Sequence, residues 1–396
     1  PLAFIGSLAY DAISDWLSRE NGIIKSYSYL IFIVAIFMGY FEVFYALSKV
    51  QLQSVFGNFV KEIFARVCAT ILLILIYFQQ ITNEQFIYAI VTVYGIRMLI
   101  MLFYAFSLYK PQFIFKLPAN SKEVFSYSFY IILAGSASGI LLDIDKFMIP
   151  QIQKIAELAY YSVGIYIASV VAIPSRAMQQ ITNPITAKEL NANNLEEVGK
   201  LYKKSSITLL ISGGLLFLLI NLNVNDLYAF IGKPEYAVGG MIVLMISIAE
   251  LYKLAIGTNG AILINSKFYR MFFYFSLAMA ISVIVLNRWL IQLIGIDGAA
   301  LATLIVVLLF STFKIIYVQR KLKMQPFTKN TLVVLVLILV LFFAFYFIEI
   351  PFHPLVNITF KSLVVTIIYV LVIYKLNLSE EVTRILKTYL EKIKRL

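Results

Sequence analysis

The sequence has little of what soluble enzymes and metalloproteins are built from. Its 396 residues include one cysteine, Cys68, and one histidine, His353, which excludes an intrachain disulfide and a site with several His and Cys ligands. Charged residues make up 14% of the chain, whereas about 25% is usual in soluble domains. The motifs GxxxxGK[ST], GxSxG, HExxH and CxxC are also absent. We therefore expect no catalytic residue, metal site or cofactor, and no direct use of ATP.

Apolar residues dominate instead, at 61% of the chain against roughly 45 to 50% in soluble proteins. They recur in blocks close to the length of about 20 residues that a membrane-spanning helix needs. The pattern predicts an all-α polytopic membrane protein with eleven complete spans. The expected spans are 27–48, 55–78, 86–109, 123–144, 157–178, 206–223, 237–257, 268–287, 296–318, 331–349 and 357–376. An apolar stretch of half that length opens at Pro1, from which we expect the chain to start inside a further helix.

The distribution of basic residues supports this map, since cytoplasmic loops are enriched in Lys and Arg. The net charge is +12, but the basic residues cluster in short gaps between apolar blocks, so we expect no nucleic-acid partner. Alternate gaps carry 20 of the 33 basic residues on one side and 6 on the other. The richer side carries Lys49, Lys110, Lys116, Lys122, Lys188, Lys200, Lys203, Lys204, Lys267, Arg270, Arg320, Lys321, Lys323, Lys329, Lys375, Arg384, Lys387, Lys392, Lys394 and Arg395. This asymmetry predicts a cytoplasmic C-terminus.

The C-terminal residues 379–396 have the pattern of an amphipathic helix. Ser379 is placed as its N-cap, Glu380 and Glu381 lie in the first turn, and apolar residues follow at helical spacing opposite a basic face. Such a helix lies on the inner leaflet and is attracted by anionic lipid. The alternative is a solvated tail helix. The segment 195–204, in the longest internal gap, also has helix character.

Seven basic residues remain inside the expected spans, where a charge is costly and tends to face a cavity. Arg66 and Arg97 lie near mid-span, where snorkelling to water is hardest, and we expect both to face a cavity. The alternative for Arg66 is a pair with Glu62, one helical turn earlier.

The other charged residues in and near the spans differ in their expected depth in the membrane. Glu250 and Lys253 share a helix face and form either part of the cavity or a self-neutralising pair, and Arg176, close to a cytoplasmic end, binds substrate or snorkels. We expect Lys314 and Lys361 to snorkel. Candidates for gating or coupling are Glu42, Asp143, Asp145 and Lys146, the last three of which could equally cap a helix.

The excess of arginine indicates an anionic cargo, because a guanidinium binds phosphate or carboxylate oxygens through a planar fork and stays charged when desolvated. Several spans also contain small residues or proline, which permit close helix approach and bending but are equally ordinary at helix contacts. These residues are Gly135, Ser136, Ser138, Gly139, Pro174, Gly213, Gly214, Gly239 and Gly240.

Four stretches carry a resemblance to a known family. VFGNFVKEIFARV (55–67) resembles the start of the family's fifth helix, and DIDKFMI with AYYSVGIY (143–149 and 159–166) its seventh helix and the opening of its eighth. GTNGAILINSKFYR (257–270) is similar to the turn after the tenth helix, and GIDGAALAT (295–303) to the start of the twelfth. By these stretches the chain resembles the polysaccharide-export, O-antigen flippase-like branch of the multidrug/oligosaccharidyl-lipid/polysaccharide exporter superfamily.

The resemblance implies a two-lobe bundle of 14 helices, of which two precede the Pro1 stretch. On that alignment 1–109 is the remainder of the N-terminal lobe (helices three to six) and 110–122 a cytoplasmic inter-lobe linker. The C-terminal lobe (helices seven to twelve) is 123–318, the terminal helix pair 319–378 and the cytoplasmic tail helix 379–396. A chain without the first two helices is not expected to transport on its own.

The resemblance further implies a flippase of the bacterial inner membrane. Its cargo is undecaprenyl-diphosphate-linked oligosaccharide for O-antigen or other surface polysaccharide, moved by alternating access, with membrane lipids and other polysaccharide-assembly proteins as partners. The substrate-binding candidates come from both lobes, as a site between two lobes requires; they are Arg66, Arg97, Arg176, Glu250 and Lys253. An ion gradient or downstream consumption of the sugar supplies the drive.

Three rival readings stay open. A multidrug extruder of the same superfamily would favour carboxylates over arginines in its cavity. A polymerase or ligase of the same pathway would carry a long outer loop with acid and base groups, which the sequence lacks. A scaffold of a glycan-assembly complex would leave Arg66 and Arg97 unexplained.

Overall fold

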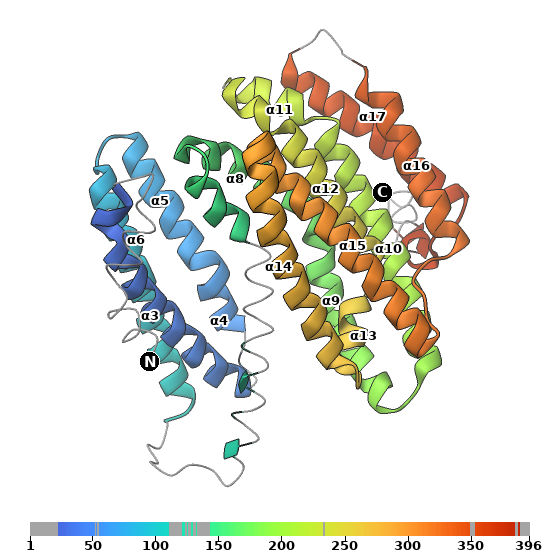
Figure 1. Cartoon of the computed structure of the whole chain (residues 1–396), viewed down its shortest axis with the longest axis horizontal. Helices are drawn as coiled ribbons and strands as arrows, with labels where there is room; N and C mark the ends of the chain where they lie inside the picture. The colour runs from blue at the N-terminus through green and yellow to red at the C-terminus, as the bar shows by residue number, and fades with distance from the viewer. Residues whose placement is uncertain are drawn as a thin grey trace. The chain divides into compact units, whose positions relative to one another are not determined.

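Helices are the only regular secondary structure among the residues that the computed structural model describes (Figure 1). Those residues are 23–51, 53, 55–110, 121–122, 125, 128–129, 132, 143–232, 234–348, 353–384 and 387–388. The Pro1 stretch, most of the expected span 123–144 and most of the linker 110–122 lie outside them. The chain divides into two compact units, unit 1 (Pro1–Ser121) and unit 2 (Lys122–Leu396).

Unit 1 is a bundle built on two long helices, α3 (Ile23–Val50) and α6 (Asn83–Leu108), packed along each other. A capping box at Thr82 starts α6, since its hydroxyl accepts from the Gln85 amide while the Gln85 side chain accepts from the Thr82 amide. The buried contacts of this unit include Phe41, Tyr45 and Met101. A shared apolar face therefore holds α3 and α6 together.

The third helical stretch of unit 1 differs from the regular helix expected over 55–78. It consists of α4 (Val55–Phe59), a π-helical turn η1 (Val60–Phe64) and α5 (Ala65–Tyr77). A π turn widens the helix by one residue and occurs frequently at functional sites. The wide turn contains Lys61 and Glu62, and Arg66 follows it in the first turn of α5.

Unit 2 contains the remaining helices, labelled in Figure 1. The first stretch joins α8 (Ile155–Ser169), a 3₁₀ turn η3 (Val170–Ala172) and α9 (Ile173–Asn191). Then follow α10 (Leu195–Asn221), α11 (Val224–Ile231), α12 (Gly240–Ala255), α13 (Asn259–Asn265), α14 (Tyr269–Ile294), α15 (Ile296–Leu322), α16 (Lys329–Tyr346) and α17 (Pro354–Lys375). Short 3₁₀ turns lie at Ile149–Gln151 and Pro234–Gly239.

Nine helices in the described part of the chain are long and apolar enough to cross a membrane. The chain is therefore a multi-pass membrane protein. Two helices are longer than the spans expected within them: 157–178 is part of a continuous stretch that runs on to Asn191, and the helix that contains most of 206–223 begins at Leu195. The added turns are polar and charged, because a helix can continue beyond the lipid into water with its charges solvated. The helix expected at 195–204 is thus the first part of α10.

The centre of unit 2 is α10, which packs against α9, α12, α16 and α17. Its two adjacent glycines make this possible. A Cβ on Gly213 would lie 2.1 Å from Leu254 of α12, and one on Gly214 would lie 2.4 Å from Ile338 of α16. Gly213 and Gly214 therefore serve the close helix approach that the sequence suggested.

The pair α14 and α15 is joined by a close contact with backbone. A Cβ on Gly298 would lie 2.2 Å from the backbone oxygen of Leu290, and the turn between the two helices passes through Gly295 with a φ of +63°. Glycine is required at both places, since no side chain fits at the first and the second has a left-handed backbone conformation.

Candidate functional site

The most buried charged group in the described part of the chain is Asp145, 2% exposed, in a helical turn that precedes α8. Three side chains donate hydrogen bonds to its carboxylate. The Tyr161 hydroxyl donates to Oδ2 at 2.6 Å, the Asn287 amide to Oδ1 at 2.6 Å and the Thr303 hydroxyl to Oδ2 at 2.9 Å. The donors belong to α8, α14 and α15, so one carboxylate ties three helices together.

Among the described residues, none forms an ion pair with Asp145. Lys146 forms its ion pair with Asp143, at 2.8 Å, and its ammonium also lies 5.6 Å from the centre of the Tyr166 ring. The three donors to Asp145 are all neutral groups. The charged group that the sequence singled out at Asp143, Asp145 and Lys146 therefore separates into an exposed pair and a buried carboxylate.

The partners of Asp145 were not foreseen from the sequence. Tyr161 and Thr303 lie within stretches noted only for their resemblance, and Asn287 is an uncharged residue at the end of an expected span. A polar side chain of this kind carries no spacing signal, because its partners are 142 and 158 residues away in the sequence. The described residues contain no group of three His, Cys, Asp or Glu side chains that could hold a metal ion.

In unit 1 the buried charge is Arg97, 6% exposed on α6. Its guanidinium lies over the Phe41 ring, 4.0 Å from the ring centre, and 5.5 Å from that of Tyr94. Its Nε has no hydrogen-bond partner, and no carboxylate among the described residues forms an ion pair with it. Stacking on an aromatic face stabilises a guanidinium while leaving its N–H groups available.

Two ion pairs lie on the wide turn of unit 1. Lys61 pairs with Glu42 of α3, and Glu62 pairs with Arg66 at 2.8 Å. The Arg66 side chain is 74% exposed on the surface of the protein. The pair with Glu62 that we considered as the alternative for Arg66 is thus present, whereas Arg97 has no such partner.

The candidates of unit 2 lie on different helices. Glu250 and Lys253 form an ion pair on α12, which is the self-neutralising arrangement considered above. Arg176 is exposed on α9. Lys314 of α15 is half-buried, with its ammonium 3.5 Å from the Met279 sulfur and 5.0 Å from the centre of the Phe272 ring.

The snorkelling expected of Lys361 is wrong. Its ammonium on α17 donates to Asp226 of α11 at 3.0 Å, and the side chains are only 10% and 17% exposed, respectively. The Asn357 amide donates to the second Asp226 oxygen at 3.1 Å, and the Asn223 amide donates to the Ser362 hydroxyl nearby. Lys361 stays buried because the Asp226 carboxylate, which lies between the expected spans 206–223 and 237–257, neutralises it there.

Comparison with known proteins identifies the fold. No family model matches the chain, and no curated protein matches it by sequence. Among solved structures, the chain is similar to the lipid II flippase MurJ in an inward closed conformation, with a TM-score of 0.71 and 13% sequence identity. The match covers 94% of this chain and 80% of that one. The chain therefore has a MurJ-like fold, and it is a multi-pass membrane protein of that architecture.

Proposed function

We propose that the protein is a flippase that moves lipid-linked oligosaccharide across the bacterial inner membrane by alternating access. The observation that carries this proposal is the MurJ-like fold over almost the whole chain, since that protein is named as a flippase of lipid II. The finer assignment is to undecaprenyl-diphosphate-linked oligosaccharide for O-antigen or other surface polysaccharide. It rests on the four sequence stretches that resemble that branch.

Arg97 is the residue proposed to meet the diphosphate. It is a permanent cation inside an apolar helix, it has no ion pair among the described residues, and its ring contacts hold the guanidinium plane. A diphosphate offers the oxygens that a guanidinium binds in pairs. Arg66, Arg176, Glu250 and Lys253 remain proposed cavity residues, with Arg66 and Lys253 free to exchange their present carboxylate partners for the cargo.

Asp145 is proposed as the residue that couples transport to an ion or proton gradient. Its carboxylate is buried and held only by neutral donors from α8, α14 and α15. A change in its charge would therefore alter hydrogen bonds to three helices at once. Glu42, Asp143 and Lys146 are proposed for gating, since each forms an ion pair that a rearrangement could break.

The test uses the intact gene in a bacterial strain that lacks its own O-antigen flippase. Surface glycan is compared for wild type, Arg97→Ala, Arg97→Lys and the control Arg320→Ala, an exposed residue in the last turn of α15. We expect wild type and the control to restore glycan, Arg97→Ala to fail at equal membrane abundance, and Arg97→Lys to be intermediate because lysine lacks the planar fork.

Two outcomes would contradict the proposal. Full restoration by Arg97→Ala would show that this arginine does not bind cargo. Failure of wild type to restore glycan, combined with increased resistance to cationic drugs in the same strain, would favour the multidrug extruder.

A further inference from the structure

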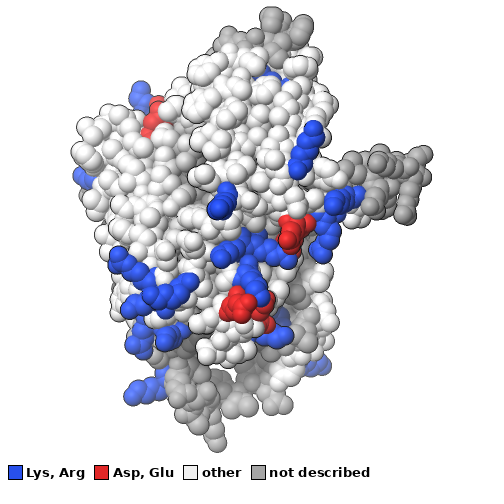
Figure 2. All heavy atoms as spheres, turned by 90° about the vertical axis from the view of Figure 1, so that its right-hand side faces the viewer, with Lys and Arg blue, Asp and Glu red and all other residues white. Residues whose placement is uncertain are grey.

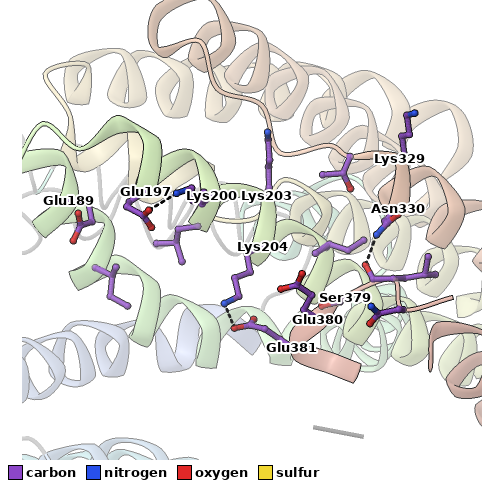
Figure 3. Close-up of a pocket in the computed structure, with 16 residues that line it drawn as sticks. Glu189, Glu197, Lys200, Lys203, Lys204, Lys329, Asn330, Ser379, Glu380 and Glu381 are labelled. Atoms are coloured by element: carbon purple, nitrogen blue, oxygen red, sulfur yellow. Dashed lines mark hydrogen bonds and ion pairs between the residues drawn. The ribbon is translucent and has the colours of Figure 1, made fainter. Parts of the chain in front are cut away.

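A pocket of about 840 Å³ lies at one end of unit 2, and none of the candidate site residues described above lines it (Figure 3). Its walls come from α9, α10, the start of α16 and the segment that follows α17. At this end α9 and α17 finish while α10 and α16 begin. The apolar run of α16 begins shortly after Lys329 and Asn330, so the pocket borders the layer of the lipid headgroups on the water side.

The same end carries many of the basic residues that predicted the cytoplasmic side. In Figure 2 the Lys and Arg side chains gather over the middle and lower part of the face, with a few carboxylates among them and a mostly uncharged surface above. Around the pocket the two signs balance. Four lysines (Lys200, Lys203, Lys204 and Lys329) and four glutamates (Glu189, Glu197, Glu380 and Glu381) line it.

Half of these charges neutralise one another. Lys200 pairs with Glu197 at 2.8 Å and Lys204 with Glu381 at 2.6 Å. In Figure 3 the side chains of Lys203 and Lys329 extend away from both pairs. Neither forms an ion pair with a described residue, and the same is true of Glu380. Glu189, the fourth glutamate, is also in no ion pair with a described residue, but its carboxylate accepts a hydrogen bond from the Asn194 amide at 2.9 Å. The pocket therefore presents two ammonium groups and the Glu380 carboxylate for a ligand to bind.

A ligand that complements such a pocket carries both a negatively and a positively charged group. Lysine ammonium groups suit a phosphate, and a carboxylate suits an ammonium group. The described residues that line the pocket include no aromatic side chain, and quaternary ammonium groups are recognised by aromatic cages, which disfavours choline. A purely anionic headgroup would leave Glu380 facing like charge. A primary ammonium, which donates hydrogen bonds to carboxylates, fits best.

The pocket also has an apolar side. Ile185, Leu201 and Ile207 are among its lining residues. One turn beyond Lys329, the surface of α16 carries exposed apolar side chains along one helix face, namely Leu332, Val336, Leu339, Val340 and Phe343. An acyl chain leaving a headgroup in the pocket would meet this face directly.

We propose that this pocket binds the headgroup of a zwitterionic phospholipid with a primary ammonium, of the phosphatidylethanolamine class. Lys203 and Lys329 hold the phosphate, Glu380 holds the ammonium, and the apolar face of α16 accommodates a chain. The proposed ligand is a lipid of the surrounding leaflet and not the cargo. A ligand bound by Glu380 would also hold the segment after α17 in place, together with the ion pair between the adjacent Glu381 and Lys204 of α10.

The test measures lipid retention by native mass spectrometry of the full-length protein in detergent. Phosphatidylethanolamine, phosphatidylcholine and phosphatidylglycerol are added in equal amounts. We expect preferential retention of phosphatidylethanolamine, reduced roughly two- to fivefold by Lys203→Ala or Lys329→Ala, as is usual for losing one exposed ion pair. Glu380→Gln should remove the preference over phosphatidylglycerol. The control Lys321→Ala, an exposed lysine outside the pocket, should change nothing.

Several results would overturn the proposal. Equal retention of the three lipids, or preference for phosphatidylglycerol in the wild type, would exclude a zwitterionic site. Binding of soluble phosphoethanolamine as tightly as the lipid would make the pocket a site for a free ligand. Displacement by undecaprenyl diphosphate alone would assign it to the cargo. Size-exclusion profiles of the variants confirm folding, and all substituted residues are exposed.

Discussion

The ion pair between Asp226 and Lys361 lends itself to a quantitative test. It joins α11 to α17 and is almost fully withdrawn from solvent, with the Asn357 amide satisfying the second carboxylate oxygen. Removing one member of such a pair typically costs about 3 to 5 kcal/mol, because the other charge is left buried and uncompensated. Removing both members and filling the space with apolar or neutral groups costs far less.

The experiment compares Asp226→Asn, Lys361→Met and the double variant by thermal unfolding of purified protein in detergent. Asp226→Asn should be the most destabilising, since it strands the Lys361 ammonium. Lys361→Met should cost less because Asp226 keeps the hydrogen bond from Asn357. The double variant should unfold at a higher temperature than Asp226→Asn. If the two single effects simply add in the double variant, the residues do not interact and the reasoning fails.

Three further predictions concern other contacts. Asp145→Asn should destabilise unit 2 by about 1 to 3 kcal/mol, because the new amide turns a donor toward groups that already donate; unchanged thermal stability would count against this geometry. Gly298→Ala should lower the yield of folded protein far more than Gly213→Ala, since the first clashes with backbone and the second with the end of a flexible leucine; equal yields would contradict it. Lys204→Ala should change stability by no more than about 1 kcal/mol and only at low salt, as measured by unfolding at two ionic strengths, and a large effect at high salt would argue against a surface pair.

The ends of a membrane helix could be predicted from the sequence where the helix ends together with its apolar run. The stretch expected at 331–349 is α16 at Lys329–Tyr346, because an apolar run of spanning length is bounded on both sides by polar residues. The first ten residues of α10 were expected to be helical but not to continue into the next span, because they are mostly charged or polar and the apolar pattern starts only after them. The short helices α11 and α13 were missed for lack of a spanning length.

The side-chain partners could be predicted only where they are local. The pairs Glu62–Arg66 and Glu250–Lys253 lie three or four residues apart and follow from helix geometry. Lys361 and Asp226 are separated by 135 residues, and nothing in either segment points to the other. The stacking of Arg97 on Phe41 likewise depends on how two helices pack, which the composition of each helix does not encode.

The hydrogen bonds of Asp145 also have a consequence for biosynthesis. Tyr161 follows it by 16 residues, but Asn287 and Thr303 follow by 142 and 158. At a synthesis rate of about 5 to 20 residues per second, the ribosome takes roughly 8 to 30 s to reach Thr303. Until Asn287 is made the carboxylate has at most one of its three donors, and until Thr303 is made it has at most two. The hydrogen bonds of Asp145 can therefore all form only after α15 has entered the membrane. Insertion of that helix supplies the last donor to this buried carboxylate.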